Sequence, residues 1–271
     1  MDKIRSVIAK SDDGTIQITF TVPYPTVKES QKAVIEEYAK TAEIPGFRKG
    51  KAPIDKVKEK IDPNTLIEKS LSRLLPKALA DAITEHKLRP AIYPRFEVIR
   101  ANTDEDWQIR AVTCELPEVD LGDYKKIIAQ ASKEKPKEQE IIKILLDSIK
   151  IDVPKILIDE EVNSKLANLL ARIEKLGLTL EGYLSSLGKN PETLREEYKT
   201  QAKNAIMLDL ILNKIAVEEK IQTNEEQIND ALRAASADPK LFEKLNTPEQ
   251  KLLVKGVLSR RSALDYLVSL I

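Results

Sequence analysis

The chain has 271 residues, enough for about two domains with separate hydrophobic cores. Lysine plus arginine equals aspartate plus glutamate, at 44 each, so no overall charge favours nucleic acid. The single cysteine, Cys114, excludes a disulfide framework and a cysteine-rich zinc site. No apolar run reaches the ~20 residues of a membrane-spanning helix, and Met1–Arg5 lacks the apolar segment of a signal peptide. We therefore expect a cytoplasmic protein.

The first 122 residues predict an α+β domain in which two pairs of strands flank a set of helices. Ile16, Ile18, Phe20 and Val22 alternate with polar residues, which is typical of a half-buried strand. Strands are expected at residues 3–9, 15–22, 95–100 and 107–115, and helices at 26–42, from Pro53, and at 63–87. This order favours an antiparallel sheet with helices on one side.

One stretch in this domain, Ile44–Pro53, has the composition of an exposed binding loop. Two prolines and two glycines in ten residues prevent a helix or a regular strand. Phe47 is predicted near the tip of the loop, beside three cations. From Arg48 to Lys60 the chain carries six cations and two anions, so the basic surface is local. The candidate binding residues are Gly46, Phe47, Arg48, Lys49, Gly50 and Lys51.

The residues alone leave two interpretations of this loop open. Phe47 could fold back onto the core and leave a solvated connection between helices. Alternatively, it could remain exposed as an apolar anchor beside donors that suit phosphates or carboxylates.

The sequence from Gly46 to Pro53 resembles the Gly-Phe-Arg-x-Gly-x-x-Pro signature of trigger factor, a family of bacterial ribosome-associated chaperones. The resemblance extends over about residues 1–122, whose predicted element order matches the ribosome-binding domain of that family. It implies that the loop docks on the large ribosomal subunit beside the exit of the nascent chain.

Beyond residue 122 the sequence predicts a linker and then an all-α domain with helical arms. Lys133–Glu138 is a charged junction, and no strand signal follows residue 120. Helix ends are marked at Pro154, Gly177, Asn190–Pro191, Thr223 with Glu226, Asp238–Pro239, and Thr247 with Gln250. We therefore expect a linker at 123–136 between domains at 1–122 and 137–271.

A second resemblance lies at the start of this helical half. Ile151–Glu161 is similar to the stretch that opens the arm helices in the C-terminal domain of trigger factor. Typical members carry, between these two parts, an FKBP-type prolyl isomerase domain of on the order of a hundred residues. Only a linker and one helix fit between Asp120 and Ile151, so the chain resembles a member without that domain.

The sequence contains no motif for an active site, a nucleotide or a metal. Adjacent glutamates such as Glu160 and Glu161 do not share a helix face and are interpreted as solvated surface. We therefore expect no enzyme activity, no cofactor and no metal.

The family resemblance implies an ATP-independent chaperone that holds emerging unfolded chains. Residues 205–212 are apolar nearly all round, which is typical of a core helix or of a surface for apolar clients. The candidate client contacts are Leu166, Leu169, Leu170, Ile206, Leu208 and Ile211.

The expected partners are the large ribosomal subunit, through an exit-site protein and rRNA, and unfolded nascent polypeptides. No membrane partner is expected, and the protein is expected as a homodimer off the ribosome. Two other functions stay open on the sequence. One is a ribosome- or RNA-binding factor without client-holding activity, and the other is a helical assembly protein for one folded partner.

Overall fold

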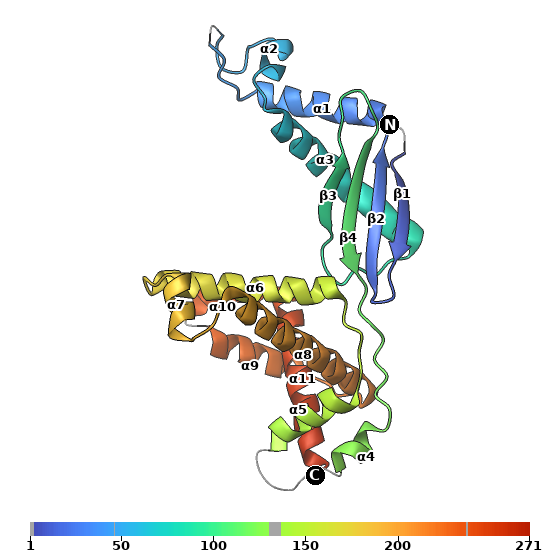
Figure 1. Cartoon of the computed structure of the whole chain (residues 1–271), viewed down its shortest axis with the longest axis vertical. Helices are drawn as coiled ribbons and strands as arrows, with labels where there is room; N and C mark the ends of the chain where they lie inside the picture. The colour runs from blue at the N-terminus through green and yellow to red at the C-terminus, as the bar shows by residue number, and fades with distance from the viewer. Residues whose placement is uncertain (1–2, 46, 130–136, 237) are drawn as a thin grey trace. The chain divides into compact units, whose positions relative to one another are not determined.

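Figure 1 shows an antiparallel sheet with helices, followed along the chain by a set of helices. The computed structural model describes residues 3–45, 47–129, 137–236 and 238–271. The chain divides into two compact units, Met1–Leu116 and Pro117–Ile271. Among the residues described, no helix is long and apolar enough to cross a membrane.

The first unit contains a four-stranded antiparallel sheet in the order β1-β2-β4-β3. Its strands are β1 (Arg5–Lys10), β2 (Thr15–Val22), β3 (Arg95–Arg100) and β4 (Trp107–Cys114). Pairing of β2 with β4 sets Phe20 opposite Ile109 and Ile18 opposite Ala111, and all four side chains are fully buried. Since alternate residues of a strand face opposite sides, these residues form one apolar face of the sheet.

Three helices complete this unit, namely α1 (Tyr24–Ala39), α2 (Ile54–Lys58) and α3 (Pro63–His86). The Asp62 carboxylate accepts a hydrogen bond from the backbone N–H of Thr65 and so caps the start of α3, as its position predicts. Helix α3 continues through Pro76, and its stripe of leucines and alanines packs in the same core as the buried face of the sheet. The predicted α+β class is confirmed.

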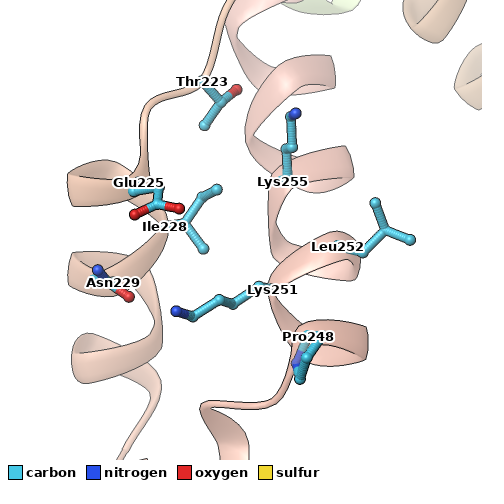
Figure 2. A pocket seen from close by; sticks show the side chains of 8 residues that line it. All are labelled: Thr223, Glu225, Ile228, Asn229, Pro248, Lys251, Leu252 and Lys255. Carbon is cyan, nitrogen blue, oxygen red and sulfur yellow. The ribbon is translucent and has the colours of Figure 1, made fainter.

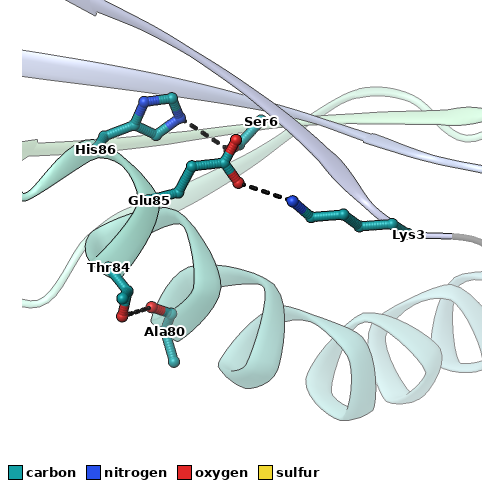
Figure 3. A network of polar contacts seen from close by, with 6 residues as sticks. All are labelled: Lys3, Ser6, Ala80, Thr84, Glu85 and His86. Carbon is teal, nitrogen blue, oxygen red and sulfur yellow. Dashed lines mark hydrogen bonds and ion pairs between the residues drawn. The ribbon is translucent and has the colours of Figure 1, made fainter.

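Polar contacts tie the end of α3 to the N-terminal part of the chain (Figure 3). Lys3 Nζ lies 3.1 Å from the Glu85 carboxylate, and the Ser6 hydroxyl lies 3.0 Å from Nε2 of His86. The hydrogen bond from Lys3 is the largest cause of the lowered pKa of Glu85. His86 therefore joins a helix end to strand β1.

The secondary-structure elements in the described residues of the second unit are all helices. Its helices are α4 (Tyr124–Ala129), α5 (Lys137–Ser148), α6 (Lys155–Lys175), α7 (Leu180–Ser186), α8 (Pro191–Glu218), α9 (Glu225–Ala235), α10 (Pro239–Leu245) and α11 (Pro248–Ser269). Helix α8 packs against α5, α6 and α11. Ile141, Leu145, Ile211, Ile215 and Leu267 are buried in its core. The predicted all-α second half is therefore confirmed.

The starts of these helices follow local sequence signals, with one correction. Asn190 and Asp238 cap α8 and α10 as predicted, and Thr247 caps α11 by accepting from the Gln250 N–H, one of the two bonds of the capping box expected there. The capping box expected from Thr223 and Glu226 is wrong, because Asn224 and Gln227, one residue later, form both reciprocal bonds. Asparagine is at least as good an N-cap as threonine, and the Thr223 hydroxyl instead lies 3.0 Å from the hydroxyl of Ser259.

The range 123–136 predicted as a linker contains α4 in its described part. Tyr124 and Ile128 lie four residues apart on one face of α4, and both are buried in the core of the second unit. The division into domains at 1–122 and 137–271 stays a prediction about which segments fold independently.

Three donors converge on Glu219, just after the end of α8. Tyr124 of α4 and Tyr266 of α11 each donate a hydroxyl hydrogen bond of 2.8 Å to its carboxylate, and Lys125 Nζ lies 2.7 Å away. The hydrogen bonds from Lys125, Tyr124 and Tyr266, in that order, lower the pKa of Glu219 to about 2. One carboxylate thus joins three helices of the second unit.

Glu219→Gln is expected to destabilise the second unit at neutral pH, because the amide loses the charge that attracts Lys125. The folded pKa of about 2 lies below the ordinary 4.5, so this stability is present above about pH 4.5 and is lost as the pH falls toward 2. Urea-unfolding midpoints of parent and variant should differ at pH 7 and converge in acid. Glu218→Gln, which removes an exposed pair with Lys214, is the control. Equal effects of the two substitutions at pH 7 would contradict this role of Glu219.

Candidate functional site

The loop between α1 and α2 presents the predicted binding residues on the surface of the first unit. Phe47 is 45% exposed, and Arg48, Lys49 and Lys51 are exposed around it. Figure 1 shows the loop beside α2, at the end of this unit away from the sheet. Gly46, which was also predicted to bind, lies outside the described residues. Of the two interpretations open on the sequence, the structure supports the exposed Phe47.

A small core separate from the main one anchors the base of this loop. Ile35 from α1, Ile44 from the loop, Val57 from α2 and Ile61 are all buried in it. Burial of apolar surface is the main stabilising contribution in such a cluster. Because Ile44 is fixed only three residues before Phe47, the cluster restricts where the exposed ring can lie.

Backbone contacts define the shape of the loop further. The N–H of Phe47 donates to the carbonyl of Ile44 at 3.0 Å, and the N–H of Gly50 donates to the carbonyl of Ala42 at 3.3 Å. Gly50 has a φ of +74°, and a Cβ atom there would lie 2.8 Å from the carbonyl oxygen of Lys40. Only glycine combines that angle with so close an approach of two backbone segments.

The cations of the loop are available to a partner. Lys49 Nζ lies 2.9 Å from the Glu43 carboxylate, but the two side chains are 62% and 76% exposed. Such a surface pair contributes about 0–1 kcal/mol, so an incoming anion can replace it. Arg48 and Lys51 form no ion pair within the part of the chain that the structure describes.

The structure gives no sign of other chemistry in the residues it describes. No group of three or more histidine, cysteine, aspartate or glutamate side chains is arranged to hold a metal ion there. Cys114 is buried in β4, and its burial raises the pKa of the thiol to about 11. A thiol in that state is a poor nucleophile at neutral pH.

The six candidate client contacts lie on α6 and α8 with different exposure. Leu170 is 46% exposed, and Leu166 and Leu169 are half-buried on the same helix. Ile206 and Leu208 are half-buried against the core of the second unit, whereas Ile211 is fully buried within it. Ile211 therefore has no surface to offer a partner, and the role of the other five stays a prediction.

A further set of exposed apolar residues was not predicted from the sequence. Leu252, Leu253 and Val257 on α11 and Val217 on α8 are 56–74% exposed. The signal that could have revealed them is the run Leu252-Leu253-Val254. Three successive apolar positions cover more of a helix than one face can bury.

Comparison with known proteins agrees with these features. Residues 5–147 match the family model of the bacterial trigger factor protein, and residues 123–269 match that of the trigger factor C-terminus. The chain belongs to the bacterial trigger factor family. The two matched regions overlap, so no further domain lies between them, as expected for a trigger factor without an inserted isomerase domain.

Curated relatives match mainly over part of their length. The trigger factor of Clostridium perfringens is 31% identical over 138 residues, which cover 51% of this chain and 32% of the relative. That of Streptococcus agalactiae is 30% identical over 149 residues, covering 55% of this chain and 30% of the relative. This trigger factor chain thus spans about a third of the length of the curated relatives it matches.

One solved structure shares the fold. This structure is described under the heading of promiscuous substrate recognition in the folding and assembly activities of the trigger factor chaperone. It aligns with 98% of this chain and 99% of its own length, at a TM-score of 0.66 and 13% sequence identity.

Gly50→Ala is expected to distort the loop, because the added methyl group meets a backbone carbonyl and the positive φ is strained as well. Gly188→Ala is the matched control, since Gly188 has a φ of +62° with no atom within 4 Å of an added Cβ. The control should lose only about 1–2 kcal/mol. Hydrogen exchange should become faster across residues 40–53 in Gly50→Ala and stay unchanged there in the control. Unchanged exchange in both variants would show that the close approach is dispensable.

Proposed function

We propose that this chain is an ATP-independent, ribosome-associated chaperone of the cytoplasm, which docks beside the nascent-chain exit and holds emerging unfolded polypeptides. The observation that carries the proposal is the exposed Phe47 beside three accessible cations, on an anchored loop, in a chain of the trigger factor family.

Docking would combine an apolar contact with charge-assisted hydrogen bonds. The Phe47 ring would enter a hydrophobic notch of an exit-site protein, while Arg48 and Lys49 donate to carboxylates or rRNA phosphates. A hydrogen bond to a charged group contributes about 1.5–3 kcal/mol. Because the buried cluster and Gly50 fix the loop in advance, little conformational entropy is lost on binding.

Holding would use the helical second unit. Leu166, Leu169 and Leu170 of α6 and Ile206 and Leu208 of α8 keep part of their apolar surface accessible. Contacts of this kind are small and interchangeable, so an affinity in the micromolar range, about −8 kcal/mol, is expected. Weak binding with fast release suits a client that must leave in order to fold. The related solved structure is described by promiscuous substrate recognition, which supports a client surface of this type.

The homodimer expected off the ribosome is part of this proposal, and sedimentation equilibrium of the free protein tests it.

The two alternative functions predict different results in binding assays. A ribosome-binding factor without clients would dock but not hold, and an assembly protein for one folded partner would not pellet with ribosomes.

The variant F47A/R48A/K49A is expected to pellet with ribosomes at least about tenfold more weakly than the parent, since it loses the apolar anchor and two charged donors. If two or three phosphates are neutralised, log affinity of the parent should fall with log salt at a slope of about −2 to −3.

The control for this assay is K87A/R89A/Y93A, which removes two cations and an exposed aromatic ring from the first unit beyond the end of α3. It should pellet as the parent does. If the loop variant pelleted with ribosomes as well as the parent does, the docking proposal would be wrong.

Stoichiometric amounts of the full chain are expected to delay aggregation of a chemically unfolded protein diluted into buffer without nucleotide. Leu170→Ser should weaken this effect about fivefold, because a half-exposed leucine contributes about 1 kcal/mol of apolar contact. Val98→Ser is the matched control, since Val98 on β3 is also 46% exposed. If the parent neither delays aggregation nor slows refolding, the holding role fails, and docking alone remains.

A further inference from the structure

A continuous groove runs along α11 in the second unit. Its wider part, about 600 Å³, lies between α8 and α11 and is lined by Val217, Ile221 and Gly256, among others. Its narrower part, about 240 Å³, lies between α9 and α11 (Figure 2). Leu252 and Lys255 line both parts, so we treat them as one site, the α11 groove.

The α11 groove has an apolar floor that stays open. Ile228 of α9 is buried at its base, while Leu252 is 70% and Val217 74% exposed. Leu253 and Val257 on the same helix are also exposed, at 63% and 56%. Contiguous apolar surface of this kind on a soluble protein marks a site of interaction.

Gly256 opens the groove further. It lies in the interior of α11, where glycine lowers helix propensity. A Cβ atom there would meet only the flexible end of Arg260, at 3.4 Å, so packing within the unit does not require glycine. The missing side chain lets the backbone of a partner approach α11 closely.

The rim of the groove carries unbalanced positive charge. Lys220, Lys251 and Lys255 line it, and none of them forms an ion pair within the described ranges. Lys251 and Lys255 lie one turn apart on α11, where like charges destabilise a helix. The anion among the lining residues is Glu225 of α9, and Figure 2 shows Lys251 extending toward that helix.

The neighbouring cations behave differently. Arg260 lies 3.1 Å from Asp209, Arg261 lies 2.7 Å from Glu138, and Lys214 pairs with Glu218. The cations that face the groove are therefore unpaired beside others that have carboxylate partners within the unit. A binding partner that supplies carboxylates next to an apolar face complements this arrangement.

We propose that the α11 groove binds an acidic amphipathic helix of a partner protein. Apolar side chains at i, i+3 and i+4 would cover Leu252 and Val217, and flanking carboxylates would pair with the lysines of the rim. The groove extends along α11 from Pro248 to Ser259, about 16 Å at the rise of an α-helix, which fits about three turns of a bound helix.

This proposal goes beyond the holding of unfolded clients. The proposed client contacts on α6 and α8 would bind any exposed apolar segment, whereas the α11 groove would select partner helices that carry negative charge. The two can therefore fail separately, and each has its own assay.

The probe is a fluorescein-labelled peptide of about 14 residues, with leucines at helical spacing and glutamates elsewhere, titrated with the full chain by anisotropy. It should bind with micromolar affinity that weakens as salt rises. A peptide with lysine in place of each glutamate should bind at least about tenfold more weakly. A peptide with serine in place of each leucine should show no binding.

Two variants test the site itself. K251E/K255E should lose at least about tenfold in affinity for the acidic peptide and gain affinity for the lysine peptide, since its charge is reversed. Leu252→Ser should weaken binding of the acidic peptide about fivefold and, because Leu252 is exposed, should leave the helical content unchanged. K143E/K150E makes the same change in net charge at exposed positions on and just after α5 and should bind as the parent does.

Three results would overturn the proposal. The first is equal binding of the acidic and basic peptides, and the second is unchanged binding of the acidic peptide in both groove variants. The third is self-association of the chain that Leu252→Ser abolishes, because the occupant would then be a second copy. Loss of aggregation delay in the parent, with peptide binding intact, would contradict the proposed holding and leave the groove in place.

Discussion

The arrangement of the loop between α1 and α2 depends on the close approach of the backbone at Gly50 to the carbonyl of Lys40. A Cβ atom at position 50 would lie 2.8 Å from that carbonyl oxygen, which is too close for any residue but glycine. The residue just after α1 and the returning loop therefore approach each other closely at this point. Ile44 and Val57 bury apolar surface in the small core at the base of the loop. An exposed phenylalanine is unfavourable in water, and it is tolerated here because the cluster beneath it supplies the stability that the ring does not.

In the second unit, helix α8 is the central packing element. Helix α8 packs on three other helices, which explains why residues 205–212 are apolar nearly all round; Asp209 in this stretch is exposed. Ile211 and Ile215 of α8 are fully buried in the core of the second unit, so any surface for a partner lies on other residues. Leu170 on α6 and Leu252 on α11 are exposed, the first near half-buried leucines and the second beside unpaired lysines, and these are the two surfaces proposed to bind partners.

Features set by local chemistry could be predicted from the sequence, and those set by packing could not. The caps at Asp62, Asn190 and Thr247 depend on residues within one turn, and the structure confirms them. Helix α4 was missed because six residues form a helix only when Tyr124 and Ile128 are buried by distant segments. The loop sequence indicated where a partner could bind, but the requirement for glycine at position 50 depends on a backbone ten residues away. The α11 groove was missed because pairing of lysines is a tertiary property.

The carboxylate of Glu219 has a mechanical consequence. Pro117, where the second compact unit begins, precedes α4 by only a few residues. Tension on the chain at that point reaches the second unit through α4, whose Tyr124 and Lys125 are held by Glu219. From Glu219, at the end of α8, the force is transmitted to α11 through the hydrogen bond from Tyr266. Helix α4 is therefore attached to the second unit in two ways, by burial of Tyr124 and Ile128 in its core and by the bonds to the Glu219 carboxylate.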